Sequence, residues 1–152
     1  MKKVLILIVI ILLGAGGYFV YQNISDKNLY TKTLDSRLSS PDWHWKNNIN
    51  QPIAEKAQAY SRYDYSFSVD IATFENENEA RKAEEDWIID HNPAKIGING
   101  KYVSYLQESN QYIYTIGEHL ISVQSGNADN STTGSFVSWY DKHFKSLFKS
   151  DI

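Results

Sequence analysis

An aromatic cluster is the feature of the sequence most suited to binding chemistry. Trp43, His44 and Trp45 follow one another among polar residues, and Tyr63 stands at the start of an alternating apolar stretch. Exposed aromatic rings stack on sugars or anchor protein interfaces, where Trp and Tyr contribute much of the binding energy. Candidates for a ligand or partner contact are therefore Trp43, His44, Trp45 and Tyr63. For the two tryptophans we favour the alternative that both pack on the sheet face that carries Ile113, because large apolar rings are more often buried than displayed.

The four histidines have no spacing typical of a metal or catalytic site: His44, His91, His119 and His143. No two of them lie four residues apart, and none has the H-x-E context of zinc deaminases. The absence of cysteine excludes disulfides, thiolate metal ligands and a cysteine nucleophile. A hydrolase that pairs Asp42 with His44 has no support in the spacing. The sequence therefore predicts a protein that is not an enzyme, with no catalytic residue, no metal and no cofactor.

Two polar loops resemble ligand-binding loops only superficially. Residues 127–132 alternate like the first half of a calcium loop, but Thr132 replaces the glycine and Ser138 the glutamate that an EF-hand requires. Residues 97–100 precede a strand and lack the Lys-Ser or Lys-Thr of a phosphate-binding loop. We interpret both as connecting segments.

Composition and charge narrow the class of protein. The chain has 152 residues, of which 42% are hydrophobic and 14% aromatic, which suits one folded domain and not a disordered chain. Its net charge is −3, and no cluster of five or more basic residues occurs. A nucleic-acid partner is therefore disfavoured, because phosphate binding requires such clusters.

The N-terminal residues predict a membrane-targeting element. After Lys2 and Lys3, residues 4–20 carry no charge, which is the minimum length for a single-pass helix. A cleaved signal peptide is the alternative, because small residues at 14–17 follow the apolar stretch. The two lysines favour a cytoplasmic N-terminus. We predict a single-pass protein of the cell membrane with its C-terminal domain extracytoplasmic, or a secreted protein if the N-terminus is cleaved.

Periodicity predicts the elements that follow. We divide the chain into an anchor or signal peptide over residues 1–21, a helical or irregular connecting segment over 22–60, and an α+β domain over 61–152. Within the connecting segment, residues 53–60 are predicted to form a short helix after Pro52. Residues 63–74 alternate between apolar and polar side chains, which predicts a half-buried strand.

The second half of the chain predicts two helices and three strands. The helices cover residues 77–91, with Asn76 or Asn78 as N-cap, and residues 135–148. The strands are 101–107, 111–116 and 119–124. In the resulting register Tyr105 lies opposite Tyr114 and Tyr114 opposite Ile121. The predicted fold is α+β: a small antiparallel-rich sheet of order β-α-β-β-β-α, with helices packed on one face, preceded by an N-terminal transmembrane helix.

Two functions are compatible with these predictions. The first is a membrane-anchored extracytoplasmic domain that binds an envelope protein or acts as a sensor, without catalysis. It follows from the apolar segment 4–20, the small core and the absence of a catalytic pattern. The alternative is a secreted or anchored module that binds a saccharide or another small ligand through exposed aromatic residues.

Overall fold

The computed structural model describes residue 22, residues 25–33 and residues 52–149. The chain separates into two compact units, Met1–Thr31 and Lys32–Ile152. In the first unit, residue 22 and residues 25–27 are helical. The predicted membrane segment 4–20 and the aromatic stretch 43–45 lie outside the described residues. Within the described part of the chain, no helix has the length and apolar character needed to cross a membrane.

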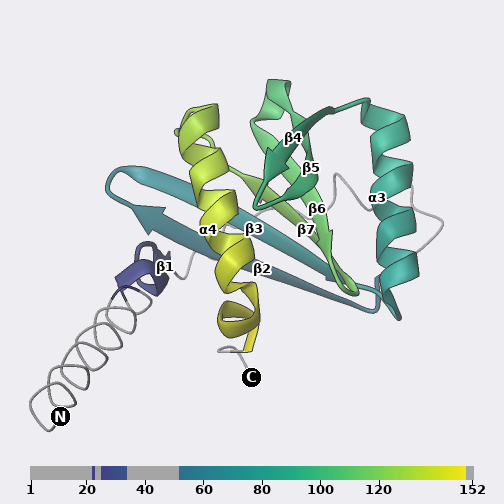
Figure 1. Cartoon of the computed structure of the whole chain (residues 1–152), viewed down its shortest axis with the longest axis horizontal. Coiled ribbons are helices and arrows are strands. Elements are labelled where there is room, and N and C mark those ends of the chain that lie inside the picture. The colour runs from purple at the N-terminus through teal and green to yellow at the C-terminus, as the bar shows by residue number, and fades with distance from the viewer. Residues whose placement is uncertain (1–21, 23–24, 34–51, 150–152) are drawn as a thin grey trace, which may run out of the picture. The chain divides into compact units, whose positions relative to one another are not determined.

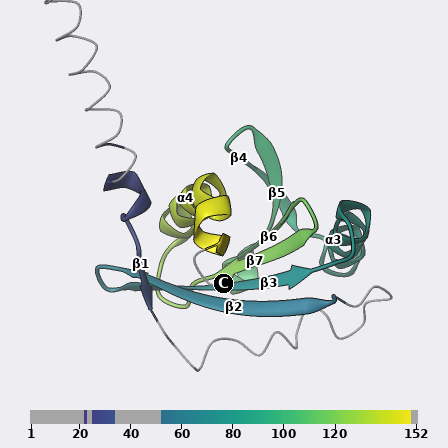
Figure 2. The same ribbon diagram turned by 90° about the horizontal axis from the view of Figure 1, so that it is seen from below.

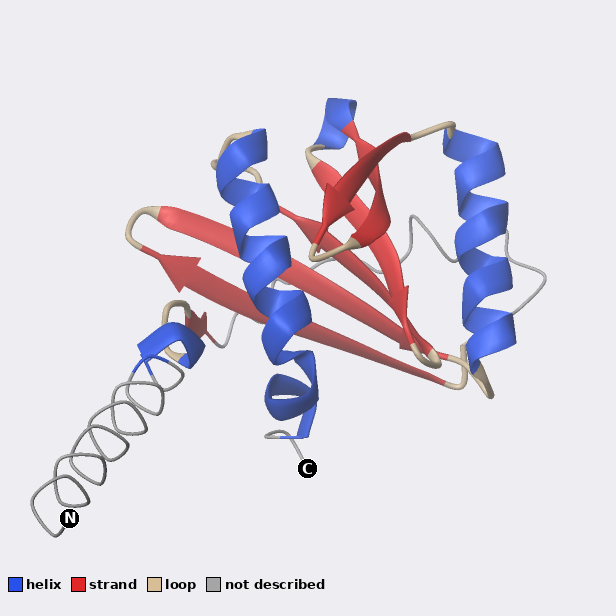
Figure 3. Ribbon diagram, in the orientation of Figure 1, coloured by secondary structure: helices blue, strands red, loops and turns tan. Residues whose placement is uncertain are grey.

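The second unit is built on an antiparallel sheet in which the strands follow the order β1-β2-β3-β7-β6-β5-β4. Helix α3 connects β3 to β4, and helix α4 follows β7 (Figures 1 and 3). The elements are β1 (Thr31–Thr33), β2 (Ala54–Arg62), β3 (Tyr65–Thr73), α3 (Glu77–His91), β4 (Ala94–Ile98), β5 (Lys101–Leu106), the 3-10 turn η1 (Gln107–Ser109), β6 (Gln111–Ile116), β7 (His119–Gln124) and α4 (Asn130–Lys149).

The predicted strand order is wrong because it lacks three strands of the sheet, β1, β2 and β4. The stretch predicted as a helix over residues 53–60 is strand β2, which pairs along its whole length with β3. Its sequence is rich in Ala, Glu, Lys and Gln, which favour helices, but pairing with β3 overrides this weak preference. The side chains of Gln58 and Tyr60 are buried in the sheet. The sheet thus begins before residue 61.

Strand β4 was also not predicted, and it forms a hairpin with β5. Ile98 lies opposite Lys101, so the connecting turn consists of two residues, Asn99 and Gly100. Both have positive φ, 50° and 79°, as a type I′ turn requires. Asn-Gly is the strongest short-range hairpin signal, and the sequence contains it at this point.

The prediction that both helices pack on one face is also wrong, because α3 and α4 cover opposite faces. Helix α3 packs against Ala72, Ile113 and Leu120. On the other face Phe67 stacks on Phe136 of α4, at 4.3 Å between ring centroids. Figure 2 shows the two helices on opposite sides of β5 and β6. Each face of the central strands therefore has its own apolar core.

Covering both faces changes the interpretation of the polar side of β3. Its alternation predicted one solvated face, but Asp70 and Ala72 are buried like Val69 and Ile71. Helix α3 also occupies the face on which the predicted tryptophans would pack, since it covers Ile113. The alternation of a strand locates its two faces correctly but does not reveal what lies against them.

The remaining predicted elements are largely confirmed. Helix α3 has the predicted bounds, and the Asn76 side chain caps it by accepting a hydrogen bond from the backbone N–H of Glu79 at 3.1 Å. Strands β6 and β7 have the predicted bounds and register, with Tyr114 opposite Ile121. Between β5 and β6 the register differs by two residues, so that Tyr105 lies opposite Tyr112. Such a slip keeps every side chain on its predicted face.

Candidate functional site

Of the four predicted contact residues, the structure describes only Tyr63. Trp43, His44 and Trp45 lie outside the described residues, so their role stays a prediction. Tyr63 and Asp64 form the two-residue turn that joins β2 to β3, since Arg62 lies opposite Tyr65. The Tyr63 side chain is 85% exposed. We call residues 62–65 the hairpin tip.

The hairpin tip is held in place by the segment between β7 and α4. The Asn127 side chain donates to the backbone carbonyl of Asp64 at 2.6 Å. Its carbonyl oxygen accepts a hydrogen bond from the backbone N–H of Ser66 at 3.0 Å. The Ser125 hydroxyl donates to the Ser66 carbonyl at 2.7 Å. These hydrogen bonds hold the backbone on the β3 side of the turn in place, so the exposed Tyr63 side chain extends from an ordered turn.

The backbone at Tyr63 is strained. Among the described residues, the non-glycine positions with positive φ are Tyr63, Asn92, Asn99 and Asn110. Asparagine tolerates this left-handed conformation, whereas a bulky residue in it is an outlier. The φ of 54° at Tyr63 therefore costs stability at a position that glycine or asparagine would occupy more easily. The Arg62 guanidinium lies 5.2 Å from the centre of the exposed ring.

Relief of this strain is a testable expectation. Tyr63→Asn should raise the free energy of unfolding by about 1 kcal/mol, because asparagine adopts the left-handed conformation at lower cost. Urea unfolding followed by tryptophan fluorescence measures the change. Tyr65→Asn is the control, since Tyr65 lies in β3 with an ordinary strand backbone. A loss of stability in Tyr63→Asn equal to that of the control would contradict the strained-turn interpretation.

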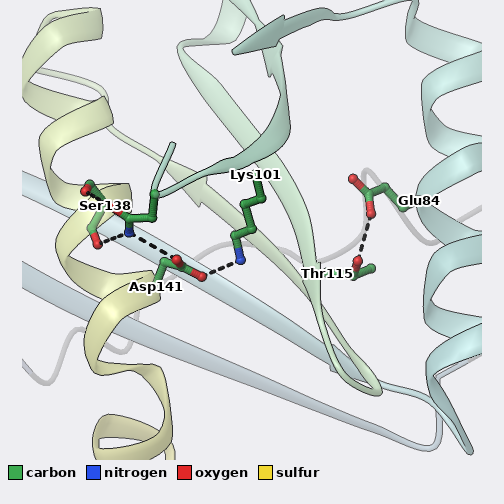
Figure 4. Close-up of polar contacts among 6 residues, drawn as sticks. Glu84, Lys101, Thr115, Ser138 and Asp141 are labelled. Carbon is green, nitrogen blue, oxygen red and sulfur yellow. Dashed lines mark hydrogen bonds and ion pairs between the residues drawn. The ribbon is translucent and has the colours of Figure 1, made fainter. Parts of the chain in front are cut away.

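A second polar cluster joins the β4–β5 turn to α4. The Ser138 hydroxyl donates to the Asn99 side-chain carbonyl at 2.8 Å, and the Asn99 amide donates to the Ser138 backbone carbonyl at 2.8 Å. The same amide also donates to Asp141, and the Lys101 ammonium forms an ion pair with Asp141 (Figure 4). These contacts attach the turn to the middle of the helix.

A third polar contact lies between α3 and β6. The Thr115 hydroxyl donates to a carboxylate oxygen of Glu84 at 3.0 Å (Figure 4). Burial raises the pKa of Glu84, and the hydrogen bond from Thr115 opposes this shift only in part. The folded protein therefore favours the protonated form of this carboxyl more than the unfolded chain does.

The raised pKa of Glu84 predicts a specific pH dependence of stability. Because the folded pKa lies above the unfolded value of 4.5, the folded state loses stability as the pH rises through this interval. Glu84→Gln keeps an acceptor for Thr115 and removes the buried charge. We expect the variant to be more stable than the native chain at pH 7, with the difference shrinking toward pH 4.

Urea unfolding at several pH values measures this difference. Glu85→Gln is the matched control, because Glu85 is the exposed neighbour on the same helix. A stability difference between Glu84→Gln and the native chain that does not vary with pH would show that the carboxyl does not titrate as proposed.

The described histidines have structural partners. His91 and His143 each contact the backbone carbonyl of the residue one helical turn earlier, at 2.9 and 2.8 Å. His119 lies 3.0 Å from the Thr73 hydroxyl and packs against Phe148. Burial lowers the pKa of His119. Within the described ranges no three His, Asp or Glu side chains are grouped so that they could hold a metal ion.

No family model, no curated protein and no solved structure matches the chain.

The residues that position the hairpin tip and the β4–β5 turn were not predicted from the sequence. The sequence predicts only a polar connecting segment around Asn127, whereas its contact with Asp64 joins residues 63 positions apart. No local pattern reveals such a contact. Asn99, by contrast, carried a usable signal, because Asn-Gly before an alternating strand predicts a tight hairpin.

Proposed function

We propose that this chain is a non-catalytic domain that binds a partner protein through its hairpin tip. We further propose that the apolar segment 4–20 holds it at the extracytoplasmic face of a membrane. The observation that carries the proposal is the display of Tyr63, which is exposed and strained on a braced turn. Strain that persists at one position suggests a functional role for the residue held there.

The chemistry of the tip supports a protein partner. Tyrosine and arginine are enriched among the residues that dominate binding energies in protein interfaces. The tip presents Tyr63 and Arg62 side by side. The hydrogen bonds from Asn127 hold the turn before any partner arrives, which reduces the conformational entropy lost on binding.

Site-specific photo-crosslinking in intact cells tests this function. A photoreactive phenylalanine analogue at position 63 should give a discrete crosslinked product with an envelope protein. Position 102 is the matched control, because Tyr102 is 78% exposed but lies within β5. Products that are identical at positions 63 and 102, or absent at both, would refute a specific contact between the tip and a protein.

The saccharide alternative predicts no protein crosslink at position 63 and is tested by a separate binding measurement. The exposed Tyr63 ring could stack on a sugar, as aromatic rings in binding modules do. In that case soluble envelope oligosaccharides would bind the purified chain, and the Tyr63→Ala variant would not bind them. The residues 43–45 that would complete such a site lie outside the described residues.

The proposed location has its own test. A C-terminal tag on the full-length protein should be digested by protease added to sealed spheroplasts, while the protein stays in the membrane fraction. A protected tag would contradict the extracytoplasmic orientation. A shortened, soluble product would instead indicate cleavage after the apolar segment.

A further inference from the structure

A groove separates the outer strand β4 from the N-terminal half of α4. The cavity measures about 520 Å³, which lies within the range of ligand-binding clefts. Ile96 and Ile98 line it from β4, Ser131 and Ser135 line it from α4, and Tyr112 completes the lining from β6. The contacts of Asn99 with Ser138 attach one end of β4 to α4, so the groove exists without a bound partner.

Alternate residues of β4 direct their backbone hydrogen-bonding groups away from the rest of the described sheet. In the two-residue hairpin, Ile98 and Lys101 form the hydrogen-bonded pair next to the turn. Because hydrogen-bonded and non-bonded pairs alternate along antiparallel strands, Gly97 and Lys95 direct their N–H and C=O groups away from β5. In the described sheet β4 is the last strand, so no neighbouring strand pairs with these groups.

The wall formed by α4 leaves room for the side chains of an added strand. Its lining residues are small: Ser131, Gly134, Ser135 and Ser138. A Cβ atom at Gly134 would lie only 3.3 Å from the Tyr112 hydroxyl, so glycine allows the helix to approach the sheet closely there. No residue that lines the groove is charged. A charged side chain buried in it would lack a partner, which is costly.

We propose that β4 accepts an extended, uncharged segment of a partner protein as an additional strand, seated between β4 and α4. The backbone of the added strand pairs with Gly97 and Lys95. Every second side chain of the added strand points toward the small residues of α4. A single strand suits this space better than the sheet edge of a second copy, because residues of α4 form the opposite wall of the groove. This surface is distinct from the hairpin tip, and its test does not depend on the tip.

Peptide selection on the full-length chain in nanodiscs tests the proposal. The probe is a phage-displayed library of random heptapeptides, followed by the most enriched peptide synthesised with a fluorescein label. We expect enriched sequences with few charges and with β-branched or aromatic residues at alternate positions, as an added strand requires. Fluorescence anisotropy then measures the affinity of the labelled peptide for each variant.

Gly97→Pro and Gly97→Ala form the decisive pair of variants. Proline removes the outward N–H of residue 97 but no bond to β5, because Gly97 and Tyr102 are a non-bonded pair. Alanine keeps the N–H, and its Cβ meets no atom within 4 Å. We expect Gly97→Pro to weaken peptide binding by about tenfold or more, and Gly97→Ala to stay within about twofold of the native chain.

A second variant tests the other wall without touching the sheet. Ser135 is exposed on α4, so Ser135→Tyr should fill the groove, leave the fold intact by circular dichroism and abolish peptide binding. Equal affinities of the Gly97→Pro and Gly97→Ala variants would overturn the proposal, and so would undiminished binding to Ser135→Tyr. The absence of any enriched peptide would overturn it too. A dimer that Gly97→Pro dissolves and Gly97→Ala preserves would overturn it in favour of a second copy as the occupant.

Discussion

Phe136→Ala should lower the free energy of unfolding by about 3 to 5 kcal/mol, the usual cost of truncating a fully buried phenylalanine. Phe136 has no exposed surface. Its ring stacks on Phe67 with 7° between the ring planes and packs against Tyr60 at 5.5 Å. It therefore joins α4 to two strands of the sheet at once. The loss would be a large share of the total stability of a domain of this size.

Urea unfolding followed by tryptophan fluorescence measures this loss. Phe136→Leu is the matched control, because it keeps most of the apolar volume and should cost less than about 1.5 kcal/mol. Equal losses in the two variants would show that the cavity at this position collapses and that the ring stack contributes little.

Asn110→Ala should lower the free energy of unfolding by about 2 to 4 kcal/mol. Alanine adopts the left-handed backbone conformation of residue 110 at a higher cost than asparagine, and it cannot form the side-chain hydrogen bonds. Asn110 has a φ of 46°. Its amide donates to the Ala128 carbonyl at 2.8 Å and to the Thr133 hydroxyl at 2.9 Å. These bonds hold the segment between β7 and α4, in which Asn127 braces the hairpin tip.

Asn110→Gly separates the two contributions. Glycine adopts the left-handed conformation freely, so this variant should lose only the hydrogen bonds and be less destabilised than Asn110→Ala. Both variants should also reduce the photo-crosslink from position 63, because the brace loosens with the segment. An intact crosslink in a variant that has lost this stability would show that the tip does not depend on Asn110.

The parts of the fold that the sequence predicted are those with a strong local period. Strands β3, β6 and β7 and the cap of α3 at Asn76 were predicted from such local patterns, and the structure confirms that these elements exist. The sorting of side chains onto the two faces of β5, β6 and β7 was also predicted, because a slip of two residues does not alter it.

The errors arose where distant contacts decide the structure. The residues of β2 favour a helix locally, and only pairing with β3 makes them a strand. The packing of α3 and α4 on opposite faces depends on segments far apart in the chain, such as Phe67 with Phe136. Strand β4 is different, because Asn99-Gly100 is a local signal for a two-residue hairpin turn. Residues 97–100 were compared only with a phosphate-binding loop, so the strand before this turn was not predicted.

The candidate site was predictable only in part. The sequence offers Tyr63 as a candidate contact residue, and its side chain is exposed in the structure. Its positive φ and its brace by Asn127 could not be predicted, since a tyrosine rarely occupies that backbone region and the brace joins distant residues.

The strand order also determines how quickly this domain can fold. The β2–β3 hairpin and the consecutive strands β4, β5, β6 and β7 each pair with neighbours in sequence. Among the strands that the structure describes, the pairing of β3 with β7 alone joins these two groups. It brings together residues such as Thr73 and His119, 46 positions apart. Non-local pairings of this kind slow folding, because chain entropy is lost before the contacts form. We therefore expect the two groups of strands to form early and their union along β3 and β7 to limit the rate.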